Sequence, residues 1–168
     1  MECDAAAEIT YVMKLRDINN RYIGDWKGNH RLILSWLPDP DFNSDSNLAI
    51  KAVANNKFLM LTYTWYHEGM AQEGVLLIGN NNNAAEVTAS WIDSWGMGGK
   101  IMNCYGKMNE QGDISVMGSY EVTDSPNWGW RIDISLPTDH NLQIKMYNVS
   151  PDGEETLAID ANYSLWTR

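Results

Sequence analysis

From Tyr22 onward the chain is a series of short runs with β-strand character, and almost every gap between them has the length of a hairpin turn. The gaps are rich in Gly, Asn, Asp and Pro, which are the residues that tight turns favour. Because short connections pair neighbouring strands antiparallel, the pattern predicts about ten strands in up-and-down order. Residues 38–47 form the longest predicted loop, and strands are predicted at residues 26–36, 48–54, 57–66, 71–79, 85–93, 100–108, 113–122, 128–136, 141–148 and 155–166.

Such a meander is expected to close into a single antiparallel barrel, since closure removes the exposed edges of the sheet. An open two-sheet sandwich is the alternative, but these connections need no Greek-key crossover. A barrel of about eight to ten strands is just wide enough inside for side chains or one small ligand. With 168 residues the chain can build one sizeable core and is short for two, so we expect an all-β fold with a single domain over residues 1–168.

The first residues differ from the rest of the chain and predict a helix. Ala5, Ala6, Ala7 and Glu8 favour helix, Asp4 is a suitable N-cap, and the Asn19-Asn20 pair is expected to end the helix. We therefore assign residues 1–21 to an N-terminal helical segment and residues 22–168 to the barrel.

Charge and cysteine content exclude several classes of partner. The formal net charge is -10, so nucleic acid and an anionic membrane surface are poor partners. No apolar run approaches the roughly 18 residues that span a bilayer. Cys3 and Cys104 are expected to be free thiols, and the acidic N-terminus does not look like a secretory signal, so we expect a cytoplasmic protein.

The aromatic composition favours a cavity. The chain has 8 Trp and 8 Tyr but only 2 Phe. Trp and Tyr combine an apolar ring with a polar tip, which suits a surface that meets both a ligand and water. Plain packing of a Trp-rich β-protein is the alternative interpretation.

The first strand resembles the entry motif of the calycin superfamily, which includes lipocalins and fatty-acid-binding-like barrels. Gly24-Asp25-Trp26 matches the Gly-x-Trp motif, and Arg168 stands where a basic residue often packs over that tryptophan. The chain is also similar to a bacterial family of lipocalin-like domains of unknown function, through Asn56-Lys57-Phe58-Leu59, Trp91-Ile92-Asp93-Ser94, Gly106, Gly118 and Ala161-Asn162-Tyr163. The resemblance implies a barrel with a ligand cavity and no known reaction. Haem-binding calycins use a His near the carboxyl end, and no His follows His140 here, so we expect no cofactor.

His30 and Asp93 are the candidate acid and base. If Trp26 points inward, strand alternation places His30 on the same inner face, and Asp93 shares a face with Trp91. Inside a barrel a neutral His can act as acid, base or ligand anchor, and a carboxylate can bind a hydroxyl group or an amine. The structural alternatives are a hydrogen-bonded core His and an Asp that caps the following glycine-rich turn.

The other candidates are aromatic and flexible apolar side chains. Trp128 and Trp130 share a strand face and could bind a flat or cationic ligand, with an Arg131–Asp133 pair on the outer face. His67 and His140 are expected at surface turns, and no residue pattern predicts a metal. The predicted ligand-binding set is His30, Trp36, Met60, Trp91, Asp93, Asn103, Tyr105, Trp128, Trp130 and Met146.

Three functions are consistent with this pattern. The first is binding of a small hydrophobic or aromatic molecule inside the barrel, with His30, Asp93 or Asn103 setting its orientation. The second is a small barrel enzyme, a cyclase, isomerase or lyase, in which His30 and Asp93 face one cavity. The third is a solid barrel whose surface aromatic residues form a homodimer.

Overall fold

The computed structural model describes residues 19–80 and 85–167. Within them the chain forms the strands β1 (Gly24–Ile33), β2 (Asp41–Val53), β3 (Phe58–His67), β4 (Met70–Asn80), β5 (Glu86–Asp93), β6 (Met102–Met108), β7 (Ile114–Tyr120), β8 (Trp128–Thr138), β9 (Asn141–Val149) and β10 (Glu155–Leu165).

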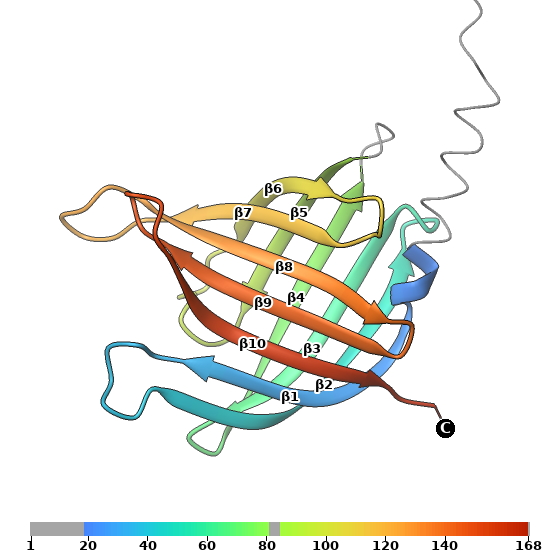
Figure 1. The fold of residues 1–168 in the computed structure, drawn as a ribbon, viewed down its shortest axis with the longest axis horizontal. Helices are drawn as coiled ribbons and strands as arrows, with labels where there is room; N and C mark the ends of the chain where they lie inside the picture. The colour runs from blue at the N-terminus through green and yellow to red at the C-terminus, as the bar shows by residue number, and fades with distance from the viewer. Residues whose placement is uncertain (1–18, 81–84, 168) are drawn as a thin grey trace, which may run out of the picture.

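The strands close into one antiparallel barrel, in which every strand pairs with its neighbours in sequence and β10 returns to pair with β1 (Figure 1). The predicted up-and-down barrel is thereby confirmed, and the open sandwich is excluded. One end of the barrel carries the short helix that precedes β1, and the β1–β2, β5–β6, β7–β8 and β9–β10 connections lie at the other end.

The start of β2 differs from the prediction. β2 begins at Asp41, so the expected loop over residues 38–47 was wrong for most of its length. This stretch pairs with β1 along its whole length, from Ile33 opposite Asp41 to Gly24 opposite Ile50. After the inward Phe42, the next two inward side chains are the small Ser44 and Ser46, and the hydroxyl groups of Ser46 and Tyr163 hydrogen-bond at 2.9 Å. Backbone pairing with β1 therefore holds this stretch as a strand, although its sequence lacks an apolar alternation.

The described residues before β1 form a single helical turn. Residues 19–22 are helical, and the amide of Ile23 donates to the carbonyl of Asn20 at 3.3 Å. Asn19 and Asn20 therefore lie within the helix and do not end it as predicted. The predicted helical residues 1–18 and Arg168 lie outside the described residues.

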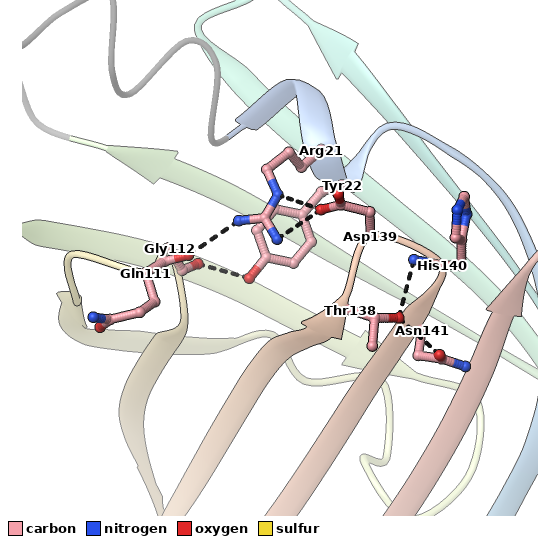
Figure 2. A network of polar contacts seen from close by, with 8 residues as sticks. All are labelled: Arg21, Tyr22, Gln111, Gly112, Thr138, Asp139, His140 and Asn141. Carbon is pink, nitrogen blue, oxygen red and sulfur yellow. Dashed lines mark hydrogen bonds and ion pairs between the residues drawn. The ribbon is translucent and has the colours of Figure 1, made fainter.

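This helical turn closes the barrel base through a small polar network (Figure 2). The Tyr22 hydroxyl donates to the carbonyl of Gly112 at 2.6 Å, and Arg21 pairs with Asp139 at 2.9 Å. Nε1 of Trp26 donates to the carbonyl of Tyr22 at 3.1 Å. Trp26 is 1% exposed and closes the base, as the calycin resemblance implies.

The half of the barrel next to the helix is filled with apolar side chains. These come from the inward face of nearly every strand and include Leu48, Ile50, Leu61, Leu76, Ile134 and Leu142, all almost completely buried. Burial of this kind supplies most of the folding free energy, at about 25 cal/mol per Å² of apolar surface. The filled base leaves the opposite end of the barrel for a site.

Candidate functional site

The end of the barrel away from the helix contains a pocket of about 1050 Å³ that opens to solvent. Its walls come from the ends of the strands away from the helix, in β1, β3 and β5 to β10, and from the β1–β2, β5–β6 and β7–β8 connections. A shift in the β10–β9 register between Leu157 and Ile159 lies at this wall, and both Ala158 and Ile159 line the pocket. The volume is at the upper end of the roughly 300–1,000 Å³ common for small-molecule sites.

Tryptophan dominates the pocket wall. Of the 8 tryptophans in the chain, six line the pocket, namely Trp36, Trp65, Trp91, Trp95, Trp128 and Trp130. The rings of Trp91 and Trp130 stack with centroids 5.3 Å apart and planes 5° from parallel. Trp65 and Trp95 meet edge to face at 6.0 Å. The wall therefore presents large, fixed π surfaces, which bind flat apolar molecules well.

A glycine lies on β7, between the strands that carry Trp91 and Trp130. Trp91 on β5 is opposite Met102 on β6, and Trp130 on β8 is opposite Gly118 on β7. A Cβ atom at Gly118 would lie 2.7 Å from Cγ of Met102. The absent side chain leaves room for Met102, which also lines the pocket.

Asp93 ends β5 and holds the aromatic wall together. Its Oδ2 accepts hydrogen bonds from the Tyr63 hydroxyl at 2.7 Å and from Nε1 of Trp65 at 3.3 Å. Its Oδ1 accepts from the amide of Trp95 at 2.8 Å, which is the turn-capping role that the sequence left open. The Tyr63 hydroxyl in turn accepts from Nε1 of Trp91 at 2.9 Å. One carboxylate thus positions three tryptophans of the pocket, directly or through Tyr63.

Burial shifts the pKa values of both hydrogen-bonding partners upward. The pKa of Asp93 is raised because burial disfavours its charged form, although the hydrogen bonds from Trp95, Tyr63 and Trp65 act in the other direction. The pKa of Tyr63 is raised well above its ordinary value by burial and by the neighbouring Asp93. Tyr63 therefore stays protonated and remains a hydrogen-bond donor.

His30 lies inside the barrel but does not line the pocket. It is 2% exposed, and its ring stacks on Trp65 with centroids 4.4 Å apart. Its Nδ1 is buried without a hydrogen-bond partner among the described residues. Burial lowers the pKa of His30 from 6.5 to about 4, so the ring is neutral at physiological pH. The structure does not bring His30 and Asp93 onto one cavity, as an acid–base pair would require.

The position of His67 differs from the one expected from the sequence. It was expected at a surface turn, but it is only 8% exposed. It ends β3 on the inward face, and its ring makes edge contacts with Phe42 at 4.9 Å and Trp95 at 5.2 Å. His140 is exposed in the β8–β9 turn, as expected (Figure 2).

The predicted ligand-binding residues fall into three groups. The first group lines the pocket and consists of Trp36, Trp91, Asp93, Trp128 and Trp130. Trp36 is 70% exposed, because β1 ends at Ile33 and leaves Trp36 in the turn at the mouth. The second group, His30 and Met146, is buried in the core without lining the pocket.

The third group lies on the outer face of the barrel, and this corrects the predicted set. Met60 alternates with the buried Leu59 and Leu61, so it points outward. Asn103 and Tyr105 flank the buried Cys104, and Tyr105 is 67% exposed. Oδ1 of Asn103 accepts a hydrogen bond from the Ser90 hydroxyl at 2.8 Å. Strand alternation therefore separates these three side chains from the interior.

Other pocket residues were not predicted from the sequence. They include Trp65, Trp95, Met97, Met102 and Tyr120. Trp65 shares an alternating face with Leu59, Leu61 and Tyr63, a signal that was available in the sequence.

The outer pair between Arg131 and Asp133 was predicted, and it is confirmed at 3.2 Å.

Within residues 19–80 and 85–167, no three His, Cys, Asp or Glu side chains gather as metal ligands. None of the helical residues that the structure describes belongs to a segment long and apolar enough to cross a bilayer.

Comparison with known proteins matches nearly the whole barrel. A sequence model of the family described as "Protein of unknown function (DUF1579)" matches residues 15–164. A search of curated proteins found no match.

Two solved structures share the fold at low sequence identity. The crystal structure of Rv2717c from M. tuberculosis is 10% identical, covers 91% of this chain and 98% of its own, and has a TM-score of 0.65. The S-type phycobiliprotein lyase CPES from Guillardia theta is 11% identical, covers 94% of this chain and 98% of its own, and has a TM-score of 0.53. At these identities the likeness concerns the fold alone.

Proposed function

Because the chain belongs to the DUF1579 family of proteins of unknown function, its role has to be argued from its own pocket, and we propose that this pocket binds a small, flat, apolar molecule. The observation that carries the proposal is that six of the 8 tryptophans line one pocket at one end of the barrel. A core needs only the apolar body of such rings, whereas here their faces and edges border open space.

The size and lining of the pocket are sufficient for useful affinity. A ligand that buries roughly 300 Å² of apolar surface gains about 7 kcal/mol before the entropic cost of association. The few polar groups in the wall, including Asp93, Ser119 and Asn148, would orient the ligand and would not supply most of the affinity. The rigid base of packed apolar side chains means that the ligand meets a largely preformed wall.

The structural neighbours are compatible with this proposal. One of them is described as a phycobiliprotein lyase, so a barrel of this shape serves a lyase in that organism. The likeness supports the barrel as a scaffold for handling small molecules and does not identify the ligand of this chain.

The proposal is tested with 1-aminoanthracene, a flat neutral fluorophore. Tryptophan excitation should produce probe emission by energy transfer, and the titration should saturate at one probe per chain. Trp36→Ala should weaken binding about threefold to tenfold, because one ring at the mouth is lost. Tyr105→Ala removes an equally exposed aromatic ring from the outer face and should leave the affinity unchanged. No saturable transfer, or an equal loss in both variants, would contradict the proposal.

A further inference from the structure

Asp93 is the deepest charged group in the pocket. Three charged residues line the pocket, and Lys100 and Glu121 are exposed near its mouth, whereas Asp93 is 9% exposed. The two residues near the mouth carry opposite charges and largely offset each other. The interior of the described pocket is therefore governed by one negative charge.

The groups that hydrogen-bond to this carboxylate leave its charge uncompensated. Its donors are the Tyr63 hydroxyl, the Trp65 indole and the Trp95 amide, all of which are neutral. None of the ion pairs formed by the described residues includes Asp93. A buried carboxylate without a cation is costly, and burial accordingly raises its pKa.

The rings around Asp93 favour the same sign of ligand charge. The face of an indole carries negative potential and attracts a cation that lies over it. Trp65 and Trp95 both donate to Asp93 and both line the pocket, so a ligand beside the carboxylate also meets indole surface. The net charge of -10 repels anions from the whole molecule.

From this arrangement we infer that the pocket selects planar aromatic molecules that carry a positive charge, with the charge near Asp93. The inference rests on the proposed binding function and adds the ligand class. Apolar stacking on the tryptophans contributes affinity for any flat molecule, and the carboxylate together with the indole faces adds a preference for cations.

The test uses three probes of nearly the same shape. These are 1-methylquinolinium, which is cationic, 1-methylnaphthalene, which is neutral, and 1-naphthoate, which is anionic. Isothermal titration calorimetry at low ionic strength should rank them in that order, with the cation at least about tenfold tighter than the neutral probe. Added salt should weaken the cation and leave 1-methylnaphthalene unchanged.

Two variants locate the preference. Asp93→Asn should abolish the cation preference, measured as the ratio of the affinities for 1-methylquinolinium and 1-methylnaphthalene. Asp45→Asn removes an exposed carboxylate of β2 and should retain the preference. If Asp93→Asn does not fold, the ranking of the three probes on the unaltered protein still decides the matter.

The outcomes separate this inference from the binding function itself. If 1-aminoanthracene binds but the cation is no tighter than its neutral isostere, the inference is overturned and the binding function stands. If no flat probe binds, both fail. A cation preference that survives Asp93→Asn would place the selecting charge elsewhere and would also overturn the inference.

Discussion

The hydroxyl group of Tyr63 on β3 donates a 2.7 Å hydrogen bond to Oδ2 of Asp93 on β5, across the intervening strand β4. The residue between them in register is Gly74, opposite Tyr63 on one side and Asp93 on the other. A Cβ atom there would lie 2.1 Å from Cζ of Tyr63. The absence of a side chain at Gly74 therefore allows the ring to reach the carboxylate that organises the pocket.

Gly74→Ala should displace Tyr63 and lower the free energy of unfolding by about 1–3 kcal/mol, because the new methyl group overpacks a buried site. Gly79→Ala is the matched control on the same strand. Its Cβ would meet the ring of Phe58 at 2.8 Å, but that ring is 40% exposed and can move. Urea denaturation should show a large loss only for Gly74→Ala. Equal losses would mean that the two glycines serve only the strand backbone.

Tyr63→Phe should also destabilise the protein, by about 1–3 kcal/mol, because Nε1 of Trp91 loses its acceptor and Oδ2 of Asp93 loses a donor. Tyr66→Phe, on the exposed outer face of the same strand, should cost less than about 0.5 kcal/mol. Tryptophan emission should shift in Tyr63→Phe and not in the control. An unchanged stability would show that the buried network contributes little.

The pH dependence of stability should carry the signature of His30. Its pKa is about 4 in the folded protein and 6.5 as an ordinary value, so the unfolded chain binds more protons between these values. The stability contributed by the neutral ring is complete above pH 6.5 and falls as the pH decreases toward 4. Between pH 7 and pH 5 the loss should be about 2 kcal/mol.

Asp93 acts on the pH dependence with the opposite sign. Its pKa is raised by burial, so the folded state holds a proton where the unfolded chain has released it, and stability falls as the pH rises through that range.

The variant His30→Phe isolates the contribution of the histidine to this pH dependence, because phenylalanine preserves the stack on Trp65. Urea unfolding at pH 7 and pH 5 should show a smaller difference in the variant. An unchanged difference would assign the effect to other groups.

The sequence was sufficient to predict the barrel because hairpin-length gaps leave consecutive strands no partner but each other. It misplaced the start of β2, since residues 41–47 contain Asn, Ser and Asp where an apolar alternation would mark a strand. Pairing with β1 supplies the stabilisation there. The composition of residues 41–47 taken alone does not reveal this pairing.

The candidate site was only partly predictable. Trp91, Asp93 and Trp130 followed from strand alternation, and all three line the pocket. Met60 and Tyr105 were included for their chemistry, although alternation with buried neighbours places them outside. Trp95 lies beyond the end of β5, where strand alternation no longer applies. Its position at the pocket depends on the hydrogen bond from its backbone amide to Oδ1 of Asp93.

The nuclear magnetic resonance signals of the tryptophan indole N–H groups test the central claim most directly. The chain has 8 such groups, six on the pocket and two, Trp26 and Trp166, away from it. Saturation with 1-aminoanthracene should shift the signals of Trp91, Trp95 and Trp130 most and leave those of Trp26 and Trp166 in place. Unshifted pocket signals, or shifts at Trp26 and Trp166 instead, would contradict a ligand site at the open end of the barrel.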